Sequence, residues 1–238
     1  MTDATDRLRD DLQVVVLTLP DKVHLPGDDP GDGDEDTDAE VTAGGEPHNG
    51  AMVALVPSVA DVARLTVEDG EPADELHLTL CFLGEATLLP AEVREALVDC
   101  VAQRVSSWPT VVGDGFNVGV FNPDGPEPCV VLGVASGQLE RAHDVVTEDV
   151  YETLETAGLT PHPQHEPWLP HVTLAYTRDA DLAELTDRVG PVTFDAVRLA
   201  FGDEVYDVPL GEGAVLVDRH DGETLYASDR AAPHEDGE

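Results

Sequence analysis

Two short stretches of alternating apolar residues constrain the fold of this chain most strongly. The first is ELHLTLCFLGE, residues 75–85. Successive side chains of a β-strand point to opposite faces, so Leu76, Leu78 and Leu80 share one face, while His77 and Thr79 share the other. The pattern predicts a strand that buries one apolar face and carries an imidazole beside a hydroxyl on its second face.

The second stretch, LPHVTLAYT (169–177), repeats this arrangement with His171 and Thr173. One HxT tripeptide carries little information, because a chain with nine histidines contains on the order of one by chance. A buried histidine beside a hydroxyl is usually structural. Two copies in matched, leucine-rich strands of opposite halves instead favour one shared functional site.

The rest of the chain predicts further strands and helices. Apolar residues recur at helical spacing over residues 90–107 and 137–157, and Gly158 follows the second segment as a C-terminal stop. A short helix is predicted at 180–189. Strands are predicted at 12–20, 51–59, 76–84, 116–122, 129–135, 171–177, 192–201, 204–210 and 213–218.

This order of elements places one HxT strand and one long helix in each half of the folded body. It predicts an α+β fold with two similar lobes. Residues 1–49 are predicted to be an N-terminal extension that holds one candidate strand and an acidic, disordered linker. Residues 50–218 are predicted to be the folded domain, and residues 219–238 a polar C-terminal tail.

The charge of the chain bears on its substrate. The sequence has 50 acidic and 12 basic residues, a net charge of −38, and Lys22 is its only lysine. Such a surface repels phosphate backbones at long range, which argues against a protein that coats nucleic acid. The charge is still compatible with an enzyme that takes one phosphodiester into a small pocket. Adaptation to high salt and a GC-rich genome are both explanations of this composition.

The acidic residues are densest in DDPGDGDEDTDAE, residues 28–40. This stretch superficially resembles a calcium-binding loop. It lacks the flanking amphipathic helices of an EF-hand, so we interpret it as a self-repelling linker.

Three widely spaced cysteines, Cys81, Cys100 and Cys129, form no CxxC motif and are interpreted as reduced thiols of a cytoplasmic protein. The charged start of the chain lacks the apolar segment of a secretion signal. No apolar run reaches the roughly 18 residues that a membrane span needs. We therefore expect no contact with a membrane.

Two histidines that face one cleft can divide acid–base work, because an imidazole titrates near neutral pH. The neutral ring takes a proton from water or a 2′-hydroxyl, and the protonated ring gives one to the leaving oxygen. Threonine hydroxyls can donate hydrogen bonds to phosphate oxygens. This set of residues suits phosphodiester chemistry and requires no metal.

The sequences HLTL (77–80) and HVTL (171–174) resemble the paired HxTx motifs of the two-histidine (2H) phosphoesterase superfamily. Their surroundings, ALVPS (54–58), CFLGE (81–85) and Pro170, are similar to its 2′-5′ RNA ligase-like, or cyclic phosphodiesterase, branch. The resemblance implies a bilobal fold in which two antiparallel sheets with flanking helices surround a central cleft.

The resemblance, which extends over about residues 50–210, also implies the chemistry. The expected activity is metal-independent opening of 2′,3′-cyclic phosphates, or of related 2′-5′ or cyclic nucleotide linkages, without a cofactor. His77 and His171 would be the acid–base pair, and Thr79 and Thr173 would bind the phosphate. Which histidine is the base stays open. The expected substrate is a small nucleotide or the end of an RNA.

Other residues carry weaker signals. Trp168 and Tyr176 are candidates for stacking on a base, with packing in the core as the alternative. Phe116 and Phe121 are interpreted as core or cleft wall.

Arg64, Arg178 and Arg198 are candidates for a local positive spot, or ordinary surface arginines. His162 and His165 lie in a proline-rich stretch that is interpreted as a loop approaching the cleft, with a zinc site as the alternative.

A second hypothesis is a non-catalytic binding or assembly module on the same fold, whose acidic N-terminal segment engages a basic protein partner. The start GAMVALVPS (50–58) is similar to that of some family members from bacteriophages of high-GC bacteria, which would allow a virion-associated location. The two intact HxT strands favour the enzyme, because a scaffold has no physical need for both.

Overall fold

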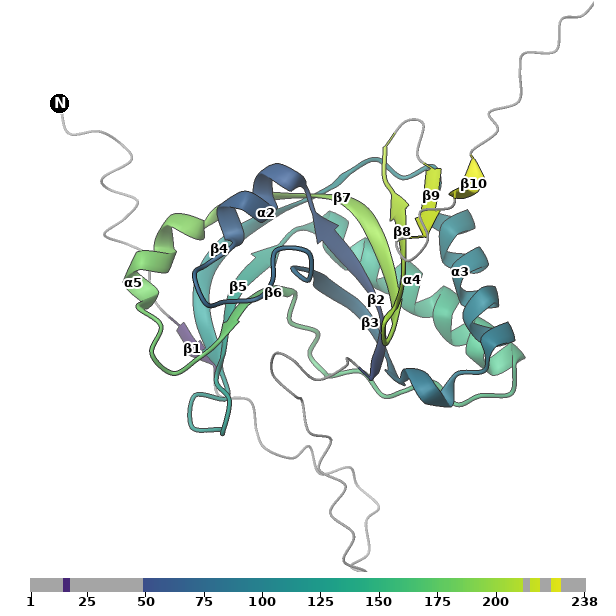
Figure 1. Cartoon of the computed structure of the whole chain (residues 1–238), viewed down its shortest axis with the longest axis horizontal. Coiled ribbons are helices and arrows are strands. Elements are labelled where there is room, and N and C mark those ends of the chain that lie inside the picture. The colour runs from purple at the N-terminus through teal and green to yellow at the C-terminus, as the bar shows by residue number, and fades with distance from the viewer. Residues whose placement is uncertain (1–14, 18–48, 212–214, 219–223, 228–238) are drawn as a thin grey trace, which may run out of the picture.

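The computed structural model describes residues 15–17, 49–211, 215–218 and 224–227 (Figure 1). The acidic stretch at 28–40 lies outside these residues, as does most of the N-terminal extension. In chain order the elements are β1 Val15–Leu17, β2 Gly50–Pro57, α2 Val59–Leu65, β3 Leu78–Glu85, η1 Ala86–Leu88, α3 Ala91–Val105, β4 Val111–Phe121, β5 Cys129–Ala135, α4 Gly137–Thr156, β6 His171–Tyr176, α5 Leu182–Leu185, η2 Thr186–Arg188, β7 Gly190–Phe201, β8 Glu204–Pro209, β9 Val215–Asp218 and β10 Thr224–Ala227.

The long strand β7 joins two lobes into one hydrogen-bonded sheet. Its first half, from Gly190 to Phe194, pairs with β4, which continues through β5 to β6. Its second half pairs with β2 on the same side, and β2 pairs in turn with β3. Strands β8, β9 and β10 extend the other side. β3 and β6 are therefore the outer strands of their lobes, and they contact each other.

The predicted α+β class, with two lobes and antiparallel strand pairing, is confirmed. Within the described residues, the pairing of β1 with β4 is the one parallel pair. The predicted strand at 12–20 is described only as β1, so the rest of that prediction lies outside the described residues. Residues 224–227 form β10 on the edge of β9, inside the segment predicted as a polar tail.

The two long helices lie together against one face of the sheet (Figure 1). The predicted apolar stripes are the buried ones: Leu97 and Val101 of α3, and Leu139, Val146 and Val150 of α4, are all almost fully buried. The Ser136 hydroxyl accepts the Leu139 amide hydrogen and caps the start of α4. Gly158, with a φ of 76°, follows its end, as the sequence predicts.

Helix α2 is absent from the prediction, which assigns residues 51–59 to a single strand. β2 ends at Pro57, and Ser58 then caps α2 by accepting a hydrogen bond from the amide of Asp61. A serine followed three residues later by an acidic residue is a signal for the start of a helix. The helix has only seven residues, too few for apolar periodicity to reveal it.

Candidate active site

The two HxT segments lie where the lobes meet. His77 directly precedes β3, and His171 is the first residue of β6. The predicted alternation holds in both, since Leu78 and Leu80 are buried, as are Val172 and Leu174, while both histidines and both threonines are half-buried. Each lobe thus turns its leucine face to the core and its histidine–threonine face away from it.

The two imidazoles are oriented by the same contact. The His77 Nδ1 lies 2.6 Å from the carbonyl oxygen of Glu75, and the His171 Nδ1 lies 2.6 Å from that of Leu169. A carbonyl oxygen only accepts hydrogen bonds, so Nδ1 carries the hydrogen in both rings. In each ring, Nε2 is therefore the atom that can gain or lose a proton. No sequence pattern indicates these main-chain acceptors.

His171 lies in an apolar setting. The edge of its ring meets Phe121, with ring centroids 4.8 Å apart and planes at 73°. Burial lowers the pKa of His171 below its ordinary value, and the hydrogen bond to Leu169 opposes this only in part. The ring is neutral at neutral pH, so its Nε2 offers a lone pair.

The two threonines have sulfur neighbours. The Thr79 Oγ1 lies 3.9 Å from the Met52 Sδ, and the Thr173 Oγ1 lies 3.5 Å from the Cys129 Sγ. The Thr173 hydroxyl also hydrogen-bonds with the Tyr176 phenol. Sulfur and a phenol are weaker acceptors than a charged oxygen, so each hydroxyl can donate to a stronger acceptor. A phosphate oxygen would be such an acceptor.

Trp168 and Tyr176 lie close to the site and pack against protein. The indole of Trp168 stacks on the His143 ring at 4.1 Å between centroids, and its Nε1 donates to the carbonyl oxygen of Thr79 at 3.3 Å. Tyr176 is half-buried at the end of β6. Burial raises the pKa of its phenol, and the neighbouring Cys129 and Glu71 add to this effect.

The three arginines considered for a positive spot are all engaged within the protein. Arg198 is only 5% exposed and forms an ion pair with Asp207, with a shortest separation of 2.8 Å. Arg64 pairs with the Asp61 carboxylate at 2.8 Å. The other acceptors are the carbonyl oxygens of Asp74 for Arg198, of Arg188 and Pro191 for Arg64, and of Pro123 and Gly125 for Arg178. These side chains bind oxygen atoms of the protein itself, so they do not present free cations.

The histidine-rich stretch at 161–168 is a loop, as predicted. The His162 ring packs edge-on against Phe82, with centroids 5.0 Å apart. Within the described ranges, no group of three or more His, Cys, Asp or Glu side chains is placed to hold a metal ion.

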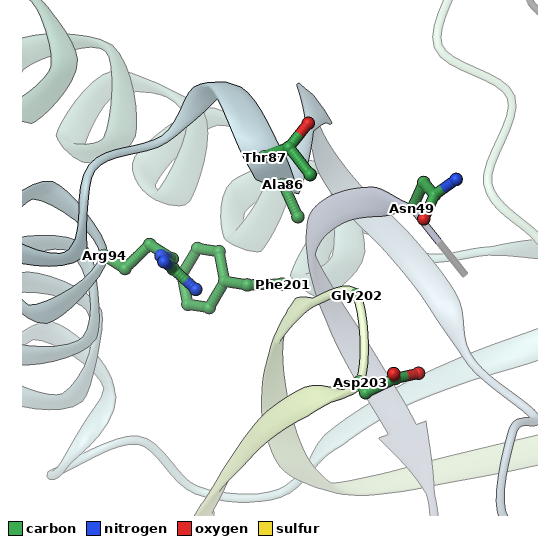
Figure 2. Close-up of a pocket in the computed structure, with 7 residues that line it drawn as sticks. All are labelled: Asn49, Ala86, Thr87, Arg94, Phe201, Gly202 and Asp203. Carbon is green, nitrogen blue, oxygen red and sulfur yellow. The ribbon is translucent and has the colours of Figure 1, made fainter. Parts of the chain in front are cut away.

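A pocket of about 240 Å³ lies elsewhere, between the starts of β2 and α3 and the turn after β7 (Figure 2). Its lining residues are Asn49, Ala86, Thr87, Arg94, Phe201, Gly202 and Asp203. None belongs to an HxT segment. These lining residues include no histidine.

Comparison with known proteins identifies the family. Residues 57–204, more than half of the chain, match the 2′-5′ RNA ligase superfamily. The chain belongs to this superfamily. The resemblance to the 2H phosphoesterases is thereby confirmed, and both HxT segments fall inside the matched range. No curated protein matches the chain in sequence.

Solved structures resemble the chain at low identity. TT0787 of Thermus thermophilus is 18% identical, with a TM-score of 0.49 over 75% of this chain and 96% of its own. Escherichia coli LigT, complexed with 3′-AMP, is 17% identical, with a TM-score of 0.45 over 76% and 97%. Kluyveromyces marxianus Usb1 is 12% identical, with a TM-score of 0.41 over 68% and 98%.

Proposed function

We propose that the protein is a metal-independent phosphodiesterase that opens 2′,3′-cyclic phosphates, or related 2′-5′ or cyclic nucleotide linkages, by acid–base catalysis. The observation that carries the proposal is the shared orientation of His77 and His171. In both rings Nδ1 donates to a carbonyl oxygen, so Nε2 is the ring atom that can take up or give a proton. Two histidines with purely structural roles would have no reason to share the same tautomer.

In this mechanism, the neutral His171 is the base. Its Nε2 takes a proton from water as the water oxygen attacks phosphorus. The Nε2–H of protonated His77 gives its proton to the ribose oxygen that leaves, so one water molecule is added across one P–O bond. The buried setting of His171, against Phe121, supports this assignment because it favours the neutral ring.

Thr79 and Thr173 are proposed to donate hydrogen bonds to the non-bridging phosphate oxygens, where charge gathers in the transition state. A hydrogen bond to a charged oxygen is worth about 1.5–3 kcal/mol. Thr79→Val and Thr173→Val, which preserve side-chain shape, should each lower kcat/KM by about tenfold to a hundredfold.

The substrate is proposed to be a small nucleotide or an RNA end. The net charge of −38 repels a long polyanion, and the three arginines considered for a positive spot are occupied by other partners.

The acidic stretch on which a binding or assembly role depended lies outside the described residues. No helix among the described residues is long and apolar enough to cross a bilayer.

The test is the hydrolysis of 2′,3′-cyclic mononucleotides in the presence of a chelator. His77→Ala and His171→Ala should each lower kcat by about 10²–10⁴-fold, the typical contribution of one acid–base group. His143→Ala is the matched control, since this histidine lies on α4, outside both HxT segments. Equal turnover by the wild type and the His77/His171 double variant would refute the catalytic assignment.

A further inference from the structure

An irregularity in β4 lies beside the His171 strand. Gly115 pairs with Val134 and Asn117 pairs with Gly133, so Phe116 is an extra residue with no partner on β5. Such a β-bulge bends the strand and re-aims its side chains. On the far side of β5, the same Gly133 pairs with His171.

The side chains of the bulge share a face with His171. Residues directly opposite in antiparallel strands point to the same side of the sheet, so a Cβ on Gly133 would mark the His171 face. That Cβ would lie 2.3 Å from the Asn117 Oδ1 and 3.1 Å from the Phe116 Cζ. Both side chains therefore lean over Gly133, towards the histidine strand, and only a glycine leaves room for them.

The burial of these two side chains does not suit a purely structural role. Phe116 is 54% exposed, the most exposed of the aromatic side chains among the described large hydrophobic residues. Asn117 is only 9% exposed, and its Oδ1 is buried without a hydrogen-bond partner among the described residues. A buried amide oxygen without a partner is costly, so a ligand that supplies the partner is a physical explanation.

We propose that Phe116 and Asn117 form a nucleobase subsite beside His171. The base stacks on the exposed Phe116 ring, and its edge pairs with the Asn117 carboxamide, which combines one donor and one acceptor end. Adenine fits this pairing best, because asparagine can bond its N6 and N7 together. The inference rests on the proposed function and names the part of the substrate that the histidines do not touch.

The experiment compares two cyclic substrates that differ only in the base: adenosine 2′,3′-cyclic phosphate and 1-O-methylribose 2′,3′-cyclic phosphate. Phe116→Ala should raise KM for the adenosine substrate about tenfold or more, since stacking on an aromatic ring contributes that much per base. KM for the base-free substrate should not change. Phe116→Tyr should restore the wild-type value. Val112→Ala, an exposed apolar residue of the same strand, is the control.

Substitution of Asn117 provides a second, independent test of the subsite. Asn117→Leu should bring the ratio of kcat/KM for adenosine and uridine 2′,3′-cyclic phosphates close to one. The melting temperature of the Asn117→Leu variant should not fall, because the substitution removes a buried amide oxygen that has no partner among the described residues. An unchanged ratio, or a loss of stability with equal losses on both substrates, would overturn the role of Asn117.

The outcomes separate this inference from the proposed function. If the wild type turns over both substrates and Phe116→Ala affects neither, or both equally, the base subsite is refuted and the enzyme stands. If the wild type turns over neither, calorimetric titration with 3′-AMP and with ribose 3-phosphate decides. Binding of 3′-AMP that is no tighter than that of ribose 3-phosphate, or that Phe116→Ala does not weaken, also overturns the subsite.

Discussion

His171 is held in its neutral form by burial, and the Phe121 ring packs against it. Burial holds the pKa of His171 below its ordinary value of about 6.5, so the basic form persists as the pH falls. The acidic limb of the kcat/KM profile should therefore lie below pH 6.5. Phe121→Ala admits water to the ring and should move this limb upward, towards its ordinary position. An acidic limb that stays in place would show that another group is the base.

Arg198 anchors the loop that precedes the other histidine, His77. Its Nη1 donates to the carbonyl oxygen of Asp74 at 2.6 Å, and the next residue supplies the carbonyl that orients His77. Thr79, Ala54, Arg198 and Asp207 are successive partners across four strands, so this ion pair lies on the same face as Thr79.

Arg198→Met should lower the free energy of unfolding by about 3–5 kcal/mol, because it breaks a largely buried ion pair with Asp207. Adding Asp207→Leu should recover most of this loss. Activity should stay low in the double variant, because the Asp74 anchor remains absent. Melting curves and kcat/KM for the two variants separate these effects, and full recovery of activity would show that Arg198 only stabilises the fold.

Among the described strands, β3 and β6 each have one edge without a β-partner. The segment that precedes β6 forms hydrogen bonds with the open edge of β3, and the segment that precedes β3 does the same for β6. Gln164 accepts a hydrogen bond from the Phe82 amide and donates to the Phe82 carbonyl oxygen, at 2.9 and 2.8 Å. The Glu71 amide, in the segment before β3, donates to the carbonyl oxygen of Leu174 in β6. These crossed contacts fix the spacing of the two histidine strands.

Gln164→Ala should therefore lower kcat/KM several-fold and speed hydrogen exchange at the Phe82 amide. The matched control is Gln138→Ala, which removes a similar bond to the Val112 amide on β4. Both variants should lose about 1 kcal/mol of stability per hydrogen bond. Equal kinetic losses in the two would show that the position of Gln164 has no special importance.

Local periodicity accounts for the elements that were predicted from sequence. The alternation around His77 and His171 and the apolar stripes of α3 and α4 were all predictable, because neighbouring residues determine them. Contacts between distant segments were not predictable. Arg198 and Asp74 are 124 residues apart in sequence, and the pairing of β7 with β2 and of β2 with β3 brings them together. The bulge at Phe116 likewise depends on its register with β5.

At the scale of the whole molecule, the net charge of −38 acts against the binding of an anionic substrate. The Debye length falls from about 10 Å at 0.1 M salt to about 3 Å at 1 M, so salt screens this repulsion. KM for a dinucleotide that ends in a 2′,3′-cyclic phosphate should therefore fall as salt rises from about 0.05 to about 1 M. A KM that rises with salt would indicate local positive charge at the site.

The groups that orient His77 and His171 are main-chain carbonyls, which every amino acid supplies. Replacing Glu75 or Leu169 leaves the acceptor in place, so the tautomer of each ring is insensitive to most point substitutions. A saturation-mutagenesis screen should then find positions 77 and 171 intolerant, while positions 75 and 169 accept many residues. The protein can diverge around its histidines without losing their geometry, provided that the path of the backbone is kept.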